Sequence, residues 1–449
     1  MRNEKLEMNK MIKYVMSLLM VMTLCLPNMQ AQIVKNQENQ DVLVNNANPE
    51  QDEEVVEDSE DSAVADSAMV ETITAETLRL PWTETVKVGL DKLLKSKMFE
   101  TSQVGIMVWD LEADSCIYRF RERQLMRPAS TMKLVTAITA LDKLGGSYQF
   151  KTTLKYTGTI DNGVLKGDVY CIGGMDPRFN NDDMTAFVTS LKDMGVDSIH
   201  GSIYADRSMK DEDLLGEGWC WDDDNPVLSP LVFGRKDIFM ERFLAKLKDA
   251  GIFYAGSGTS VKRCPASAFT ICTRFHTMDQ ILHKMMKDSD NLYAESMYYQ
   301  IASSTGNRPA SAKSARNVQR QLVRKIGLDP ARYKFADGSG LSLYNYVSAE
   351  LEVKLLRYAY QDENILPHLK QSLPIAGVDG TLKRRMRSGF AHGNVKAKTG
   401  TVTGVIGLAG YCKAANGHDL CFSILNNGIM HSNNARSFAD KVCELLCQP

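Results

Sequence analysis

The spacing of hydrophobic positions changes several times along the chain and predicts a protein of mixed helices and strands. Apolar residues recur at helical spacing over residues 83–97. The segments VGIMVWD and SCIYRF, separated by LEAD, are typical of an antiparallel hairpin. A second helix is predicted from Ser130 to Leu144, where two glycines follow. Helix, hairpin and helix make the first part of a domain that is not complete at this point of the chain.

Short strands and marked turns occupy the middle of the chain. The predicted elements here are strands at 153–160 and 164–172, helices at 182–195 and 239–251, and a strand around SIYAD. Strands that alternate with helices indicate a small α/β or α+β unit. We therefore expect an inserted domain over residues 147–272.

The last third of the chain returns to a helical pattern and then ends in strands and a helix. Helices are predicted at 278–302, 314–327 and 432–446, and strands at 395–400, 405–414 and 420–427. These strands alternate hydrophobic and small residues at period two, as in a sheet packed on helices. We expect one discontinuous domain over residues 79–146 and 273–449, with a sheet that takes strands from both ends of the chain.

The N-terminal residues predict export. Basic residues precede the apolar run YVMSLLMVMTLCL, which ends in the small-residue site MQA before Gln32, the layout of a signal peptide over residues 1–31. This run is short for a bilayer span, although an uncleaved N-terminal anchor is the alternative. We expect the mature protein in the periplasm or at the cell-envelope surface.

Charge is distributed unevenly after the signal. Residues 36–78 contain thirteen Asp or Glu and no Lys or Arg, so residues 32–78 are predicted to form an acidic, disordered linker. The rest of the chain is net basic. A basic body could favour an anionic polymer, although a solvated surface with no such role is the commoner explanation. A basic body is compatible with peripheral association with a membrane or the cell wall. No nucleic-acid partner is expected. The sequence does not indicate the oligomeric state.

The positions of the cysteines and histidines bear on two questions, whether the chain has a disulfide and whether it binds a metal. Cys412 and Cys421 flank ANGH, and a two-residue turn at Asn416 and Gly417 would place them opposite one another on adjacent strands. A disulfide and two packed thiols are both compatible with this. The seven histidines include no HExxH and no pair at metal-ligand spacing. No metal and no cofactor are therefore expected.

Three short motifs suggest catalysis when they are taken together. They are STMK, with Ser130 and Lys133 on one face of a helix start, SDN at 289–291, and KTG at 398–400 on a predicted strand. Alone, Ser130 would be read as an N-cap, Lys133 as a solvated side chain and the other two motifs as a turn and a strand end. Their joint occurrence in an exported protein favours acyl transfer through a serine ester. A Ser-His-Asp hydrolase is disfavoured because the sequence has no GxSxG elbow.

The chemistry explains why these residue types would act together. A serine hydroxyl needs an adjacent base, and a free lysine with a pKa of about 10.4 is rarely neutral at pH 7. Burial and a second cation, for which Lys398 is the candidate, would lower the pKa of Lys133. Ser289 and Asn291 are then a hydroxyl relay and an amide donor. The remaining assignments are oxyanion donors at the amides of Ser130 and Thr401, and a carboxylate site at Lys398, Thr399 and Gly400.

The same residues carry a resemblance to a known family. STMK, SDNLYAES, DGSGLS, LPIAGVDGTLKRRM and VKAKTGTVTGVIGLAGY resemble the D-alanyl-D-alanine carboxypeptidase/endopeptidases of the S13 peptidase type, which are low-molecular-mass penicillin-binding proteins. The resemblance implies a serine β-lactamase/transpeptidase-like domain, an antiparallel sheet covered by helices and split by an insertion. It also implies peptidoglycan muropeptides as substrates, β-lactams as covalent inhibitors, Ser130 as the nucleophile and Lys133 as its base.

Departures from the family pattern concern recognition of the substrate. The insertion lacks the further nested domain that family members usually carry, and Val227, Leu228 and Leu343 stand where a tyrosine and an arginine are common. The sequence does not separate carboxypeptidase from endopeptidase action, since both cleave after a D-alanine. The alternative function is a non-catalytic muropeptide-binding or β-lactam-sensing protein with the same fold.

Overall fold

The computed structural model describes residues 81–220, 225–256 and 260–449. These residues belong to one compact unit. The predicted signal peptide and acidic linker lie outside the described residues. In the described ranges, no helix is long and apolar enough to cross a membrane.

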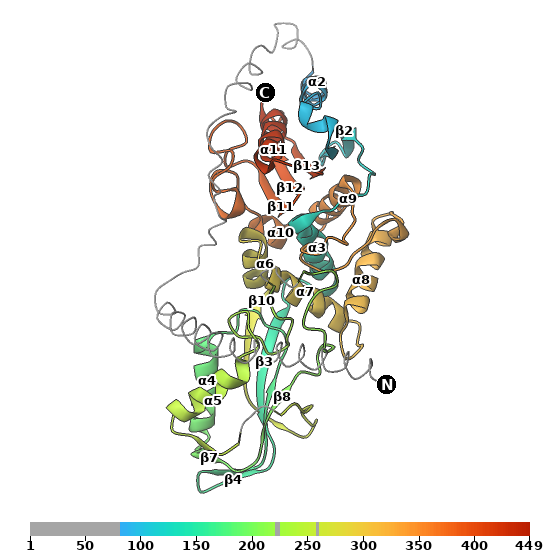
Figure 1. Cartoon of the computed structure of the whole chain (residues 1–449). Coiled ribbons are helices and arrows are strands. Elements are labelled where there is room, and N and C mark those ends of the chain that lie inside the picture. The colour runs from blue at the N-terminus through green and yellow to red at the C-terminus, as the bar shows by residue number, and fades with distance from the viewer. Residues whose placement is uncertain (1–80, 221–224, 257–259) are drawn as a thin grey trace, which may run out of the picture. The chain divides into compact units, whose positions relative to one another are not determined.

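A five-stranded antiparallel sheet forms the centre of the larger part of the fold (Figure 1). In spatial order its strands are β11 (Lys396–Val402), β12 (Val405–Lys413), β13 (Asp419–Asn427), β1 (Gln103–Asp110) and β2 (Ser115–Phe120). Strands from the two ends of the chain are neighbours, because β1 pairs with β13 along its whole length. The predicted antiparallel sheet with strands from both termini is confirmed.

Each face of this sheet packs against helices. One face carries α2 (Trp82–Leu93) and α11 (Ser432–Cys447), which share a hydrophobic core with the sheet. The other face carries a larger core built with six further helices, namely α3 (Met132–Leu144), α6 (Met278–Lys287), α7 (Asn291–Ser303), α8 (Ala312–Lys325), α9 (Ala349–Tyr360) and α10 (Leu366–Ser372). Both faces of β12 are therefore buried, which explains its nearly continuous run of small and apolar residues.

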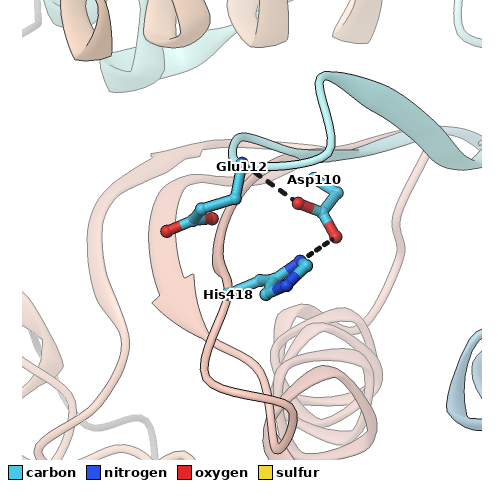
Figure 2. A group of neighbouring side chains, drawn as sticks. All are labelled: Asp110, Glu112 and His418. Atoms are coloured by element: carbon cyan, nitrogen blue, oxygen red, sulfur yellow. Dashed lines mark hydrogen bonds and ion pairs between the residues drawn. The ribbon is translucent and has the colours of Figure 1, made fainter.

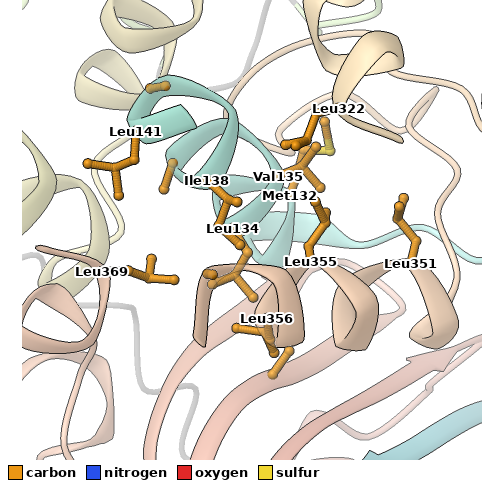
Figure 3. Close-up of a cluster of buried hydrophobic side chains, with 14 of the residues drawn as sticks. Met132, Leu134, Val135, Ile138, Leu141, Leu322, Leu351, Leu355, Leu356 and Leu369 are labelled. Atoms are coloured by element: carbon orange, nitrogen blue, oxygen red, sulfur yellow. The ribbon is translucent and has the colours of Figure 1, made fainter. Parts of the chain in front are cut away.

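Helix α3 lies inside this second core. Every residue from Met132 to Leu141 is buried, so the helix has no solvent face over that stretch. Figure 3 shows Leu134 and Ile138 near leucines of α9 and α10, and Val135 near Leu322 of α8. The apolar packing on all sides fixes the first turn of α3 in place.

The middle of the chain forms two small mixed sheets and two helices. The first sheet has the order β10 (Phe269–Thr277), β3 (Gln149–Tyr156), β6 (Val169–Ile172) and β8 (Ile203–Asp206). The second has the order β4 (Thr159–Asp161), β5 (Val164–Lys166), β7 (Ser198–Ile199) and β9 (Phe253–Tyr254). Helices α4 (Asn181–Asp193) and α5 (Phe239–Asp249) share a separate core with them. The predicted limits of the insertion, near residues 147 and 272, remain predictions.

The register of β12 and β13 corrects one prediction about the cysteines. Cys412 pairs with Leu420 and Cys421 with Tyr411, so the two thiols are one position out of register and neither forms a disulfide. The chain between the strands is a longer loop, closed by Lys413 and Asp419, and not the predicted two-residue turn. A shift of one residue sends a side chain to the other face of the sheet. Cys412 therefore lies in the α11 core and Cys421 in the α9 core.

Candidate active site

The predicted serine and lysine of STMK lie at the entrance to α3. Ser130 is in a single 3-10 turn, Ala129–Thr131, and α3 begins only at Met132. The N-cap of α3 is Thr131, which makes no side-chain capping bond, so the reading of Ser130 as the helix cap is wrong. The backbone of Ala129 has a φ of 48°, a left-handed conformation that is uncommon for alanine. This turn presents the hydroxyl of Ser130 to Lys133.

The ammonium group of Lys133 is buried and fully engaged. Its Nζ lies 2.9 Å from Ser130 Oγ, 2.7 Å from Asn291 Oδ1 and 2.9 Å from the carbonyl oxygen of Ser339. The latter two atoms are acceptors, whereas a hydroxyl can either accept or donate. When Lys133 is neutral, it can donate to the two acceptors and accept the hydrogen of Ser130. The arrangement is therefore suited to proton removal from the serine.

The SDN motif lies in a break between two helices. Residues 278–302, which were predicted to be helical, form α6 and α7, separated by a turn in which Ser289 has a φ of 61°. Asp290 caps α7 by accepting from the amide of Tyr293, and Asn291 is the first residue of the helix. The sharp turn allows Ser289 and Asn291 to contact different lysines.

The KTG motif lies on β11, at the edge of the five-stranded sheet. Lys398 is buried, and its Nζ donates to Ser289 Oγ and to the carbonyl oxygen of Thr399, both at 2.8 Å. A Cβ added at Gly400 would lie 2.6 Å from the carbonyl oxygen of Pro128. The glycine of the motif is thus needed because β11 packs directly on the turn that holds Ser130.

Five of the predicted residues are brought together by these contacts. Ser130, Lys133 and Asn291 form one hydrogen-bonded group, Ser289 and Lys398 form another, and the 289–291 turn joins them. The other three predicted residues follow along β11. Thr399 Oγ1 donates to Thr381 Oγ1 over 2.7 Å, and the side chain of Thr401 is exposed. The assignment of oxyanion donors stays a prediction.

Burial shifts the pKa of both lysines. Desolvation lowers the pKa of Lys133 to about 8, although the nearby carboxylates of Asp337, Asp290 and Glu295 act in the opposite direction. Desolvation, followed by the positive charge of Lys133, lowers the pKa of Lys398 well below its usual range. With a pKa near 8, about one Lys133 side chain in ten is neutral at pH 7, against about one in 2,500 for a free lysine.

The sequence did not predict the residues that hold the turn next to Lys133 in place. The buried carboxylate of Glu295 accepts from the amides of Gly338 and Ser339, at 3.0 and 2.7 Å. This fixes the turn whose carbonyl oxygen binds Lys133. Gly340, with a φ of 85°, allows that turn to approach the backbone of Ala129, because a Cβ there would lie 1.8 Å from a carbonyl oxygen. The available signals were the glycine-rich DGSGLS segment and an acidic residue within the buried helix α7.

A separate group of polar side chains lies at the end of the sheet. Figure 2 shows Asp110, Glu112 and His418, whose potential ligand atoms lie within 4.8 Å of one another. Asp110 already accepts from the amide of Glu112 at 3.1 Å and pairs with His418 Nδ1 at 2.8 Å. Glu112 accepts from the amide of Asp419 at 2.6 Å. These bonds tie the β1–β2 turn to the loop between β12 and β13.

The sheet covered on both faces, with a serine and a buried lysine at the start of its central helix, defines the class of serine β-lactamase/transpeptidase-like proteins. The chain belongs to the D-Ala-D-Ala carboxypeptidase 3 (S13) family, whose profile matches residues 86–233 and 231–448. The predicted family and fold class are confirmed. The protein is a serine-type D-Ala-D-Ala carboxypeptidase, a hydrolase, by family.

Individual relatives agree with this placement. D-alanyl-D-alanine carboxypeptidase DacB of Haemophilus influenzae is 26% identical over 75% of this chain and 87% of its own. The D-alanyl-D-alanine carboxypeptidase of Actinomadura sp. is 27% identical over 77% of this chain and 81% of its own. The crystal structure of penicillin binding protein 4 from Haemophilus influenzae has a TM-score of 0.73 at 24% identity and covers 79% of this chain and 97% of that chain. That protein has also been solved in complex with a β-lactam.

Proposed function

We propose that the protein is an exported DD-peptidase that cleaves peptidoglycan peptides after D-alanine by way of a Ser130 ester. The observation that carries the proposal is the distance of 2.9 Å between Ser130 Oγ and the buried amine of Lys133. A lysine in this position is both close enough to take the serine proton and sufficiently desolvated to be neutral in part of the population. Membership of the family supports the reaction class, and the names of relatives that are D-alanyl-D-alanine carboxypeptidases support the substrate.

The first chemical step follows from the contacts of Lys133. Its neutral amine takes the hydroxyl proton of Ser130 while Ser130 Oγ bonds to the carbonyl carbon of the penultimate D-alanine. Asn291 Oδ1 and the carbonyl oxygen of Ser339 accept hydrogen bonds from the amine before the transfer and from the ammonium after it. The proton acceptor therefore keeps its orientation throughout the step, which favours catalysis by limiting reorganisation.

The second step releases the leaving group. The carbon–nitrogen bond breaks, and the departing amine receives the proton that Lys133 took from Ser130, relayed by the hydroxyl of Ser289, whose Oγ accepts from Lys398. The backbone amides of Ser130 and Thr401 stabilise the negative oxygen of the tetrahedral intermediate. Lys133, neutral again, then takes a proton from the water that attacks the ester carbonyl carbon, and returns it to Ser130 Oγ as the ester bond breaks. Thr399 and Gly400 contribute to the site for the terminal carboxylate.

A β-lactam provides the direct test of this function. Purified protein is treated with fluorescent penicillin and separated on a denaturing gel, alongside the Ser130→Ala variant. The parent chain becomes labelled and the variant does not, because no other residue forms the ester. Ser102→Ala is a matched control, since its hydroxyl donates to the carbonyl oxygen of Met98 and takes no part in the site. Equal labelling of Ser130→Ala would refute the assignment.

Digestion of purified muropeptides separates the two forms of peptidase action. Carboxypeptidase action releases free D-alanine, whereas endopeptidase action converts cross-linked dimers into monomers, and mass spectrometry distinguishes the products. Labelling by penicillin without either product would instead support a binding or sensing protein. Export is tested separately, by finding the Ser130-labelled protein in the periplasmic fraction of cells that express the full chain.

A further inference from the structure

A buried carboxyl group joins α9 to the five-stranded sheet near the turn that holds Ser130. It belongs to Glu352, whose exposed fraction is 0%. Its Oε2 accepts a hydrogen bond from the hydroxyl of Ser423 on β13 at 2.6 Å. Its Oε1 is also buried and has no hydrogen-bond partner among the described residues. The function proposed above gives no role to Glu352.

The surroundings of Glu352 favour an uncharged carboxyl group. Burial raises the pKa of Glu352 to about 7, and the hydroxyls of Ser423 and Thr131 act in the opposite direction. Within the described part of the chain, no charged side chain contributes to this shift. A buried charge without a partner is costly, so the core favours the neutral acid. A neutral acid carries one hydrogen to donate, and Oε1 is the oxygen that lacks a partner.

Thr131 connects this carboxyl group to the turn of the nucleophile. It directly follows Ser130 in the chain, and it is buried. Its Oγ1 donates to the carbonyl oxygen of Pro128 at 2.8 Å, which closes the turn. A hydroxyl that donates one hydrogen bond can also accept one. Since the Thr131 hydroxyl is near enough to lower the pKa of Glu352, it is the acceptor available to an Oε1–H group.

The turn depends on its neighbours for its shape. Ala129, with its φ of 48°, has a conformation that persists only where surrounding groups fix it. The sheet supplies part of this support, because a Cβ added at Gly400 or Gly407 would lie 3.1 or 3.0 Å from Thr131 Cγ2. The methyl group of Thr131 thus packs on β11 and β12. Its hydroxyl group is the part that a residue of α9 can hold.

We propose that Glu352 is a positioning residue for Ser130, which it holds in place through the hydroxyl of Thr131. Glu352 acts as a neutral acid that accepts from Ser423 and donates to Thr131, and it does not touch the substrate. This inference rests on the DD-peptidase function proposed above and adds a residue of α9 to it. Without this bond the turn loses its polar link to α9. Ser130 Oγ is then held less well against the amine that takes its proton, which slows acylation.

The test measures penicillin acylation in Glu352→Met and Glu352→Gln by stopped-flow mixing. Methionine has a similar length and no hydrogen to donate, whereas glutamine keeps an oxygen for Ser423 and an N–H group for Thr131. We expect the acylation rate constant to fall about tenfold in Glu352→Met and to stay within about threefold in Glu352→Gln. The Kd of the complex that precedes acylation should change by less than about twofold, because no substrate contact is altered.

A second substitution separates positioning from a general effect on the fold. Thr131→Val removes the hydroxyl that Glu352 holds and keeps the shape of the side chain. It should slow acylation by itself, and Glu352→Met should add no further loss in the Thr131→Val background. A general loss of stability, measured by urea denaturation, would act in both backgrounds and would not be restored by glutamine. If Glu352→Met does not fold, Thr131→Val decides the question alone.

The same helix supplies a matched control. Glu350 is also a buried glutamate of α9, and it forms an ion pair with Arg123 at 3.3 Å. Glu350→Met should be acylated at the parent rate. Acylation at the parent rate in Glu352→Met or Thr131→Val, or an equal loss from Glu352→Met in both backgrounds, would overturn the proposal. If the parent itself is not labelled by penicillin, the DD-peptidase function fails, which is a different result.

Discussion

Lys398 Nζ lies 2.8 Å from Ser289 Oγ, although the two residues are separated by 109 positions in the chain. This contact joins the edge of the sheet to the turn between α6 and α7. On the opposite side of that turn, Asn291 contacts Lys133. The two lysines therefore contact the same short segment, residues 289–291. Substitution of either lysine is expected to affect the same reaction, at different steps.

Acylation should depend on pH through Lys133. Because the neutral amine is the proton acceptor and burial lowers its pKa to about 8, the acylation rate should increase with pH and level off above about pH 8. Stopped-flow measurement with a chromogenic cephalosporin between pH 5.5 and 9.5 gives the profile. A rate that falls over the range from pH 6 to 8 would contradict the role of Lys133 as base.

Removal of Lys398 should impair acylation without unfolding the protein. The loss of one preorganised donor commonly costs about 100- to 1,000-fold in rate, and we expect Lys398→Ala to fall in this range for penicillin acylation. Lys396, two residues earlier on the same strand, supplies the control, because its substitution by alanine removes a lysine from β11 without touching Ser289. Similar rates for the two variants would show that Lys398 has no special role.

Glu295 should matter mainly for stability. Alanine at this position would leave the buried amides of Gly338 and Ser339 unpaired, at a cost of about 1–3 kcal/mol for each group. Glutamine retains an acceptor oxygen, so Glu295→Gln should be the milder variant in urea denaturation. Equal stability of the alanine and parent proteins would show that these two bonds are unimportant.

The same residue should give the folded state a specific pH dependence. Burial, with Asp337 as a second cause, raises the pKa of Glu295 to about 8, above the ordinary value of 4.5. Between these values the unfolded chain has lost a proton that the folded chain keeps, so this group's contribution to stability decreases as pH rises. Urea denaturation at pH 5, 6.5 and 8 should show a smaller decrease for Glu295→Gln than for the parent.

The thiols of Cys412 and Cys421 should not be linked to each other. The strand register places them on opposite faces of the sheet, in two different cores, which is incompatible with disulfide geometry. Peptide mapping of the unreduced protein should therefore find no Cys412–Cys421 linkage. Detection of that linkage would show that β12 and β13 pair in a different register.

Local sequence patterns determined much of this protein. Hydrophobic periodicity located the main strands and helices, and the three motifs identified the residues at 130, 133, 289, 291 and 398. These features are short-range, because residue type and spacing within a few positions decide which face of an element is buried and which residues can be neighbours on it. The order of the motifs along the chain was sufficient to indicate the family.

Only the tertiary structure decided how these pieces meet. It divided the helical segment predicted over 278–302 into two helices, moved the start of α3 past Ser130, and shifted Cys412 and Cys421 out of register. It also brought in Glu295 and Glu352, whose partners are more than fifteen positions away in the chain. Turn conformations, strand register and buried pKa values depend on packing between distant segments, and the free energy of that packing is not encoded in any short stretch of sequence.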